Sequence, residues 1–164
     1  MFAAWGDPDP YRLIPGGDFE GSLVWNLSSG AGLFAENSPL GTVPAGQRSV
    51  RITNQGSITS PAFCVDADHP WMRFMLRSRG TNGKTDLRVE ALWTAPDGGQ
   101  GVATLGNERA RGTTTWDASS KLPLSSRLPI PSGGSLDVRI RLSDPGNDSD
   151  WLIDDVYVDP RASR

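Results

Sequence analysis

The sequence has very few of the residues that form covalent cross-links or metal clusters. Cys64 is the one cysteine and His69 the one histidine among 164 residues. A single cysteine cannot form an intrachain disulfide or a multi-cysteine metal site, and a single histidine cannot form a histidine metal cluster. We expect Cys64 to pack as a small buried apolar group, with an exposed reactive thiol as the alternative. A chain of this length can bury a full-sized core without cross-links.

Long apolar runs and a large net charge are missing as well. No stretch approaches the roughly 18 apolar residues of a membrane span, so the sequence predicts no membrane insertion. The net charge of -3 gives no electrostatic reason to expect nucleic-acid binding. The opening "MFAAWGDPDP" contains no apolar signal segment and looks like an initiator Met placed on a mature start. We still expect a secreted, extracellular protein, because of the resemblance described below.

Catalytic motifs are also missing from the sequence. It contains no Gly-x-Ser-x-Gly elbow, no phosphate-binding loop and no zinc-protease motif. Adjacent carboxylates such as Asp154 and Asp155 could in principle hydrolyse a glycosidic bond. Because side chains alternate along a strand, these two should point to opposite sides and could not flank one bond. We therefore expect a protein that binds its ligand without catalysis, and not an enzyme.

Glycine, proline and tryptophan are plentiful instead. The 19 Gly and 13 Pro favour many short strands joined by turns. The length fits one domain, and six Trp argue against disorder. We expect an all-β, antiparallel β-sandwich of about ten short strands over residues 13–160, preceded by an extended segment at 1–12. The expected strands cover residues 23–27, 32–36, 49–54, 57–63, 71–78, 86–94, 101–105, 113–116, 136–142 and 151–158.

Three of the expected strands alternate clearly enough to assign faces. The inward sets are Met72, Phe74 and Leu76; Leu87, Val89, Ala91 and Trp93; and Leu136, Val138, Ile140 and Leu142. The outward sets are rich in arginine, with few acids: Trp71, Arg73, Met75 and Arg77; Arg88 and Glu90; and Asp137, Arg139 and Arg141. If these strands are neighbours, their outward residues would form a ladder of cross-strand ion pairs.

Three segments occur in the order typical of one family of sugar-binding domains. They are "LIPGGDFEGSLVWNLSSGAG", "GQRSVRI" and "WLIDDVYVD". The sequence resembles the carbohydrate-binding modules with a galactose-binding-like jelly-roll fold, which typically carry Gly-Asp-Phe-Glu near the start, a Trp a few residues on, and a final Ile-Asp-Asp-Val strand. Here these features are residues 17–20, Trp25 and residues 153–156. The resemblance implies a jelly roll and a polysaccharide or cell-surface glycan as partner.

The resemblance also implies a structural calcium ion between the first and last strands, away from the sugar. Carried over, its ligands are Asp18, Glu20 and Asp154, with a backbone carbonyl near Arg48. Calcium takes 6 to 8 oxygen ligands and mixes carboxylates with carbonyls. We expect Asp154 to share the inward face with Leu152, Val156 and Val158, so that a cation would compensate its burial. The alternative is that Asp154 caps loop amides or pairs with an arginine.

A competing cluster in "DPGNDSD" comprises Asp144, Asn147, Asp148 and Asp150, and it matches no calcium-loop pattern.

The expected ligand site combines aromatic and charged side chains. Trp25 and Trp93 have core-like positions, whereas Trp71, Trp116 and Trp151 are better placed for exposure. We expect binding on the outward sheet face, and the arginines there suit an anionic glycan. The expected ligand-binding residues are Trp71, Arg73, Arg88, Glu90, Arg139 and Arg141. The alternative for this face is a set of self-neutralising ion pairs, each of which contributes little to stability.

A second class of function stays open. The chain could be a secreted or cell-surface structural sandwich that self-associates and binds no sugar. Sandwiches expose sheet edges, and the Pro-rich segment at 1–12 could cover an edge or exchange between subunits. A free Cys64 and an exposed Trp would suit a protein interface as well as a sugar site.

Overall fold

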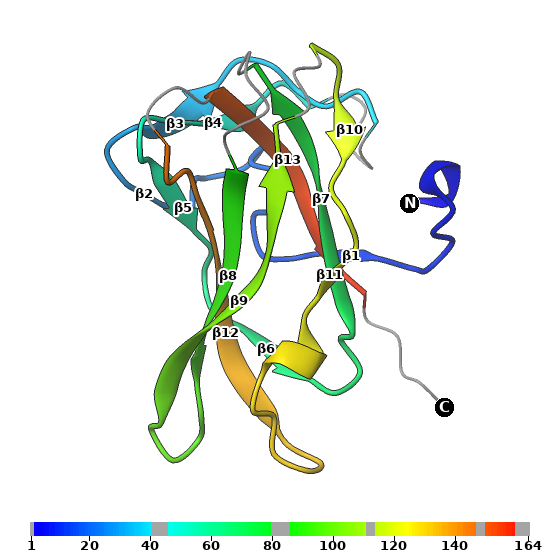
Figure 1. Ribbon diagram of the computed structural model, residues 1–164, viewed down its shortest axis with the longest axis vertical. Coiled ribbons are helices and arrows are strands. Elements are labelled where there is room, and N and C mark those ends of the chain that lie inside the picture. Colours follow the sequence, from blue (N-terminus) through cyan, green and yellow to red (C-terminus); the bar gives the residue numbers. More distant parts are fainter. Residues whose placement is uncertain (1, 41–45, 80–85, 111–113, 147–149, 160–164) are drawn as a thin grey trace.

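The expected antiparallel β-sandwich is confirmed. A computed structural model describes residues 2–40, 46–79, 86–110, 114–146 and 150–159. These residues form two antiparallel sheets packed face to face (Figure 1). Sheet A has the strand order β10-β7-β13-β4-β3, with β1 beside β13 and β11 beside β7. Sheet B has the order β2-β5-β12-β8-β9, with β6 beside β12. Within the described ranges, no helix is long and apolar enough to cross a membrane.

The elements follow the chain as short strands with two single-turn helices. Their order is η1 (Ala3–Trp5), β1 (Arg12–Leu13), β2 (Asn26–Leu27), β3 (Ala31–Phe34), β4 (Ser49–Thr53), β5 (Ser57–Thr59), β6 (Phe63–Asp66), β7 (Trp71–Ser78), β8 (Asp86–Thr94), β9 (Gln100–Arg109), β10 (Asp117–Ala118), β11 (Leu122–Pro123), η2 (Ser125–Arg127), β12 (Ser135–Ser143) and β13 (Asp150–Val158). The expected strand at 57–63 is divided into β5 and β6 near Pro61, which has no N–H for a ladder. The expected strand at 113–116 is absent over 114–116, and residue 113 lies outside the described residues.

The inner faces of the two sheets form one hydrophobic core. All three inward sets predicted from alternation join it, although Trp93 is only partly buried. Strands β8 and β12 pair over seven residues, so their apolar side chains meet in register, as in Ile140 opposite Ala91. The strict apolar and polar alternation in these two strands therefore fixed their faces correctly.

The outer face of sheet A is covered by the amino-terminal segment. Residues 2–11, here called the strap, run along this side of the molecule to β1 (Figure 1). Phe2 is fully buried against Met75 and Tyr157, whose rings and side chains form a second apolar cluster outside the main core. The Phe2 and Tyr157 rings meet edge to face, with centroids 5.6 Å apart. The strap therefore closes the outer face of sheet A around β7 and β13.

A β-bulge in β13 reverses the face expected for Asp154. Asp154 is paired with Met75 of β7, and the next aligned pair is Tyr157 with Arg73, so the register shifts between them. Asp155 lies in this bulge with φ 48°, a left-handed conformation that is uncommon for a residue other than glycine.

The bulge lets both halves of β13 direct apolar side chains into the core. Trp151 and Ile153 face the core before the bulge, and Val156 and Val158 face it afterwards. Asp154 therefore lies on the outer side with Met75. Of the expected inward set, Val156 and Val158 are confirmed, whereas the inward placement of Leu152 and Asp154 is wrong. The expected exposure of Trp151 is also wrong, because its side chain is fully buried.

Candidate functional site

The six expected ligand residues are divided between the two sheets. Arg88 and Glu90 of β8 and Arg139 and Arg141 of β12 share the outer face of sheet B, whereas Trp71 and Arg73 belong to β7 of sheet A. The expectation that all six form one face is therefore wrong. Strands β7 and β8 are successive in the sequence, but the chain crosses from one sheet to the other between them. Whether the four residues on sheet B bind a ligand stays a prediction.

Arg73 contacts the strap, and Trp71 contacts the Lys121 side chain that binds the strap. Neither residue is part of an exposed site. Arg73 is buried, and its Nη1 donates to Oδ2 of Asp7 at 3.1 Å. Its guanidinium also lies 4.5 Å from the centroid of the Phe2 ring. The Trp71 ring lies 5.2 Å from Nζ of Lys121, which in turn donates to Asp7 at 3.2 Å. These contacts engage Arg73 and Trp71 within the protein, so neither is placed as the expected exposed ligand residue.

On the outer face of sheet B, one arginine is neutralised and another is not. Arg141 is opposite Glu90 in register, and its Nε and Nη2 lie 2.9 and 2.8 Å from Oε2 of Glu90. The expected cross-strand ion pair is thus present at this position. Arg139 is opposite Leu92, and among the described residues no carboxylate lies within ion-pair distance of its guanidinium. Arg139 therefore presents an exposed, uncompensated charge on this face.

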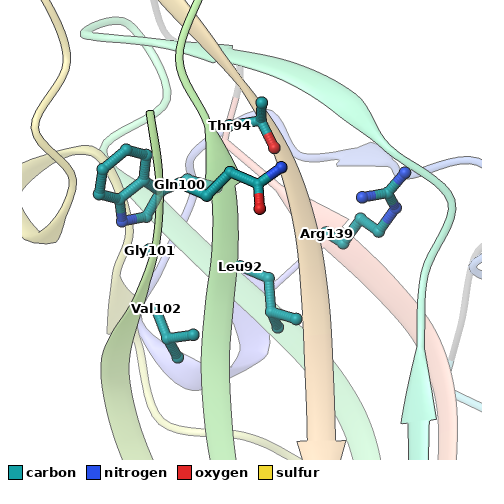
Figure 2. A pocket seen from close by; sticks show the side chains of 7 residues that line it. Leu92, Thr94, Gln100, Gly101, Val102 and Arg139 are labelled. Atoms are coloured by element: carbon teal, nitrogen blue, oxygen red, sulfur yellow. The ribbon is translucent and has the colours of Figure 1, made fainter. Parts of the chain in front are cut away.

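A hollow lies beside Arg139. It has a volume of about 270 Å³ and is lined by Leu92, Trp93, Thr94, Gln100, Gly101, Val102 and Arg139. Figure 2 shows Leu92 between Val102 and Arg139, which follows from the register of β9, β8 and β12. The Gln100 amide reaches across β8 towards Thr94 (Figure 2). The hollow thus joins an apolar floor, hydrogen-bonding groups and a cation, and sequence alternation alone did not single out Leu92, Gln100 or Val102.

Gly101 makes room for an indole at the rim of this hollow. Trp93 and Gly101 are register partners, and a side-chain carbon added at Gly101 would lie only 2.5 to 2.9 Å from atoms of the Trp93 ring. The absence of a side chain at Gly101 therefore lets the indole lie over β9. Trp93 packs against the main core, as expected, and is only partly buried, so it also lines one side of the hollow.

The residues expected to bind calcium do come together. The β1 end of the chain pairs with β13, and the Val156 N–H donates to the Gly17 carbonyl at 3.0 Å. Asp18 and Glu20 follow this contact, close enough to the carboxylates of Asp154 and Asp155 to interact electrostatically with them. The predicted neighbourhood of the "GDFE" segment and the last strand is confirmed.

Backbone amides already bind several oxygens of this acidic cluster. Asp154 accepts hydrogen bonds from the N–H groups of Ser38 and Asp155, both at 2.8 Å. Glu20 Oε1 accepts from the N–H groups of Gln47 and Arg48, both at 2.7 Å. Asp154 thus caps loop amides, as the metal-free alternative anticipated.

The electrostatics of the cluster favour an added positive charge. Burial, together with the charges of Asp155 and Glu20, raises the pKa of Asp154 to about 8. Burial, together with the charges of Asp18 and Glu20, raises the pKa of Asp155 to about 6.

Oδ2 of Asp155 is buried and has no hydrogen-bond partner in the structure. The donor set of hard oxygens suits calcium. However, no three acidic side chains among the described residues have the spacing of a metal site, so binding would require them to move inwards.

Two members of the competing acidic cluster, Asp144 and Asp150, already have partners within the protein. Asp150 forms a fork with Arg51, at 2.9 and 2.8 Å, and Asp144 accepts from the Gly146 N–H. Asn147 and Asp148 lie outside the described residues. Cys64 is exposed, so the expected burial is wrong and the alternative of an exposed thiol is confirmed. The competing acidic cluster thus includes an aspartate already used in an ion pair of sheet A.

The fold has counterparts among carbohydrate-binding modules. No protein-family model and no curated protein matches the chain. The CBM22-1 xylan-binding domain of Xyn10C from Paenibacillus barcinonensis has 13% identity and a TM-score of 0.61, over 87% of this chain and 90% of that one. The family 11 carbohydrate-binding module of Lic26A-Cel5E from Clostridium thermocellum has 17% identity and a TM-score of 0.53, over 93% and 95%.

A third match belongs to a much longer protein. The enzymatically active domain of tailspike protein 4 from bacteriophage CBA120 has 13% identity and a TM-score of 0.57, over 88% of this chain but 21% of that one. At such low identities the likeness concerns the fold. The chain therefore has the β-sandwich fold of carbohydrate-binding modules, and this likeness does not extend to a particular ligand.

Proposed function

We propose that this chain is a non-catalytic glycan-binding domain that holds its ligand on the outer face of sheet B. The main support is the difference between the two outer faces. The strap covers the outer face of sheet A around β7 and β13, whereas Arg88, Val102 and Arg139 are exposed on sheet B. The shared fold with xylan- and glucan-binding modules supports a polysaccharide or cell-surface glycan as partner. A secreted, extracellular location accords with such a partner.

An acidic glycan suits this face better than a neutral one. The outer residues of β8 and β12 include three arginines, at positions 88, 139 and 141, and three acids, Asp86, Glu90 and Asp137. Glu90 is paired with Arg141, and Asp86 with Arg109 of β9 at 3.8 Å. Arginine recognises carboxylate, sulfate and phosphate through its planar fork. Arg139 has no carboxylate within ion-pair distance among the described residues, so its charge would attract an anionic group of a polymer, and the face still offers hydrogen bonds to hydroxyl groups.

Calcium has a structural role in this proposal, away from the glycan. Asp18, Glu20 and Asp154, joined by Asp155, would hold the ion between the β1 end and β13. Bound there, the ion would supply positive charge to buried carboxylates and link the first strand to the last. The carbonyl ligand expected near Arg48 stays a prediction. The Arg48 N–H donates to Glu20, so this part of the backbone lies beside one of the proposed ligands.

The proposal is tested by affinity electrophoresis in gels that contain neutral, uronic-acid and sulfated polysaccharides. The double variant Arg139→Gln and Arg141→Gln should lose retention on whichever polymer retards the wild type. Thermal unfolding checks that the variant is folded, although loss of the Arg141 partner of buried Glu90 should lower its melting temperature. Arg12→Gln is the matched control, because Arg12 is an exposed arginine on sheet A. Equal retention of the double variant and the control would show that the site is elsewhere.

A second candidate is a structural sandwich that self-associates. The exposed thiol of Cys64 and the 56% exposed Val102 on the edge strand β9 favour it. Mass measurement in solution separates the two proposals. A monomer that binds a polysaccharide supports the glycan-binding domain, and a defined oligomer that binds none of the polymers supports the structural role.

A further inference from the structure

We propose that the hollow beside Arg139 binds a uronic acid unit and that Arg139 recognises its carboxylate. This inference rests on the proposed function, because it concerns the same face of sheet B, but it specifies the sugar class and the residue that selects it. The hollow is formed by β8, β9 and β12, and it lies next to Arg139 on the register row that contains Leu92 and Val102.

Arg139 is the arginine of this face that a ligand carboxylate can use most directly. The Arg141 guanidinium is already paired with Glu90 at 2.8 Å, so a ligand there would have to compete with a bound carboxylate. Arg88 is exposed but does not line the hollow. Arg139 lines the hollow, and no carboxylate of the described chain lies within ion-pair distance of it. A planar guanidinium binds a carboxylate with two parallel hydrogen bonds.

The floor of the hollow suits a sugar ring that brings its own charge. Leu92 and Val102 lie side by side in register and offer an apolar surface to the C–H groups of a pyranose. Thr94 and the Gln100 amide can exchange hydrogen bonds with hydroxyl groups. Strands β9 and β12 contain no aromatic residue, and the one in β8, Trp93, lies against Gly101 at the rim. With little aromatic stacking available, an ion pair would supply much of the affinity for the ligand.

The spacing favours a carboxylate bonded directly to the ring. Arg139 and Leu92 are directly opposed, and neighbouring strands are roughly 5 Å apart. A ring on Leu92 would therefore have a carboxylate on its edge within reach of the next strand, whereas a sulfate ester extends further. The volume of about 270 Å³ falls below the range of roughly 300–1,000 Å³ typical of drug-sized ligands. The hollow thus suits one sugar unit of a polymer.

The test uses polymers that differ only in charge. Polygalacturonate, alginate and hyaluronan are each compared with the carboxyl-reduced form of the same polymer, in which the carboxylate is a neutral hydroxymethyl group. Dextran sulfate is the sulfated probe. The proteins are the wild type, Arg139→Gln, Arg139→Lys and the control Arg127→Gln, which removes an exposed arginine of η2. Dissociation constants are measured by affinity electrophoresis, and folding is checked by thermal unfolding.

We expect the wild type to bind at least one uronic acid polymer about 10-fold more tightly than its reduced form, in line with a charge-assisted hydrogen-bond pair. Arg139→Gln should remove this preference, Arg139→Lys should keep part of it, and Arg127→Gln should keep all of it. Equal binding of charged and reduced polymers, preference for dextran sulfate alone, or an unchanged preference in Arg139→Gln would overturn the inference. In those cases glycan binding on sheet B could still hold, whereas the proposed function itself fails if no neutral or charged polymer is retained.

Discussion

Asp154 and Asp155 show how a single bulge changes the chemistry of two neighbouring residues. In a regular strand they would point to opposite faces, but the left-handed backbone at Asp155 lets both be buried near Asp18 and Glu20. Desolvation and mutual repulsion then raise the pKa of each carboxyl group. The repulsion among these buried carboxylates is unfavourable, and either protonation or a bound divalent cation would reduce it.

The first prediction concerns calcium removal. Because both carboxyl groups have folded-state pKa values above the ordinary value of 3.8, the folded state binds more protons than the unfolded state between about pH 4 and pH 8. In EDTA, stability should therefore fall as the pH rises through this window. A bound calcium ion would keep the carboxylates ionised and paired, so calcium should raise the melting temperature more at pH 8 than at pH 5. At a calcium concentration 100 times the dissociation constant the gain is about 2.7 kcal/mol.

Asp154→Asn provides the control for calcium. The amide removes a titrating buried charge, but its NH2 group replaces one of the two oxygens that accept backbone N–H groups. In EDTA the melting temperature of this variant should therefore depend less on pH than that of the wild type. It should also lose the response to calcium. A wild type whose melting temperature at pH 8 is the same in EDTA and in calcium would contradict the proposed ion.

The second prediction concerns Gly101. An alanine methyl group would contact the Trp93 ring at 2.5 Å, so the indole must move away from the rim of the hollow. Gly101→Ala should cost about 1–3 kcal/mol of stability, weaken glycan retention and change tryptophan fluorescence. Gly32→Ala is the matched control, since an added carbon there has no neighbour within 4 Å. Unchanged fluorescence and retention in Gly101→Ala would show that Trp93 does not shape the hollow.

At the scale of elements, the strap closes one face of the sandwich with a buried polar network. Asp7 accepts hydrogen bonds from Tyr11 at 2.8 Å, Arg73 at 3.1 Å and Lys121 at 3.2 Å. Burial opposes ionisation of Asp7, but these three partners together hold its pKa below the ordinary value. The strap is thus attached by a carboxylate that stays charged well into the acid range.

The third prediction follows from this network. Asp7→Asn leaves the Arg73 and Lys121 charges less compensated, and it should lower stability at pH 7 by about 3 kcal/mol, the lower end for a broken buried ion pair. Because the folded-state pKa of Asp7 is lowered, its contribution exists above about pH 4 and is lost as the pH falls further. The difference between variant and wild type should shrink at pH 3 in urea unfolding. Asp97→Asn, in an exposed turn, should stay within about 0.5 kcal/mol of the wild type. A constant Asp7→Asn effect at both pH values would argue against the ion pair.

At the scale of the whole molecule, the two sheets carry different features on their outer faces. Sheet A carries the strap and the acidic cluster, and sheet B carries the exposed arginines and the hollow. The overall charge of -3 opposes the approach of an acidic polymer, so attraction must be local to the arginine face.

The fourth prediction is a salt dependence. The screening length falls from about 10 Å at 0.1 M salt to about 3 Å at 1 M. Binding of an acidic glycan should therefore weaken several-fold between these concentrations, whereas the melting temperature in calcium should change little. Measurement of retention at both salt concentrations, with a neutral polymer for comparison, checks this. Retention that is independent of salt would mean that the arginines do not attract the ligand through their charge.

The sequence allowed some parts of this architecture to be predicted and hid others for a physical reason. The faces of β8 and β12 were predicted correctly, because polar residues on an open face and apolar residues on a core face alternate strictly. In β13 nearly every side chain is buried, one side by the core and the other by covering segments, so no alternation marked its faces or its bulge. The contact of the "GDFE" segment with the last strand was predictable from the resemblance. The expectation that six ligand residues share one face failed, because it required β7 and β8 to be neighbours and they lie in different sheets.

The sequence by itself determined the fold class, the inner faces of the regular strands and the presence of arginines on an outer surface, because all three depend on the order of polar and apolar residues along one strand. Only the tertiary structure decided which partner or surface each arginine contacts. It placed Arg73 under the strap, paired Arg141 with Glu90 and left Arg139 beside a hollow. Those outcomes depend on which strands become neighbours and on what covers each sheet, and the chain sets these through long-range packing that local patterns do not encode.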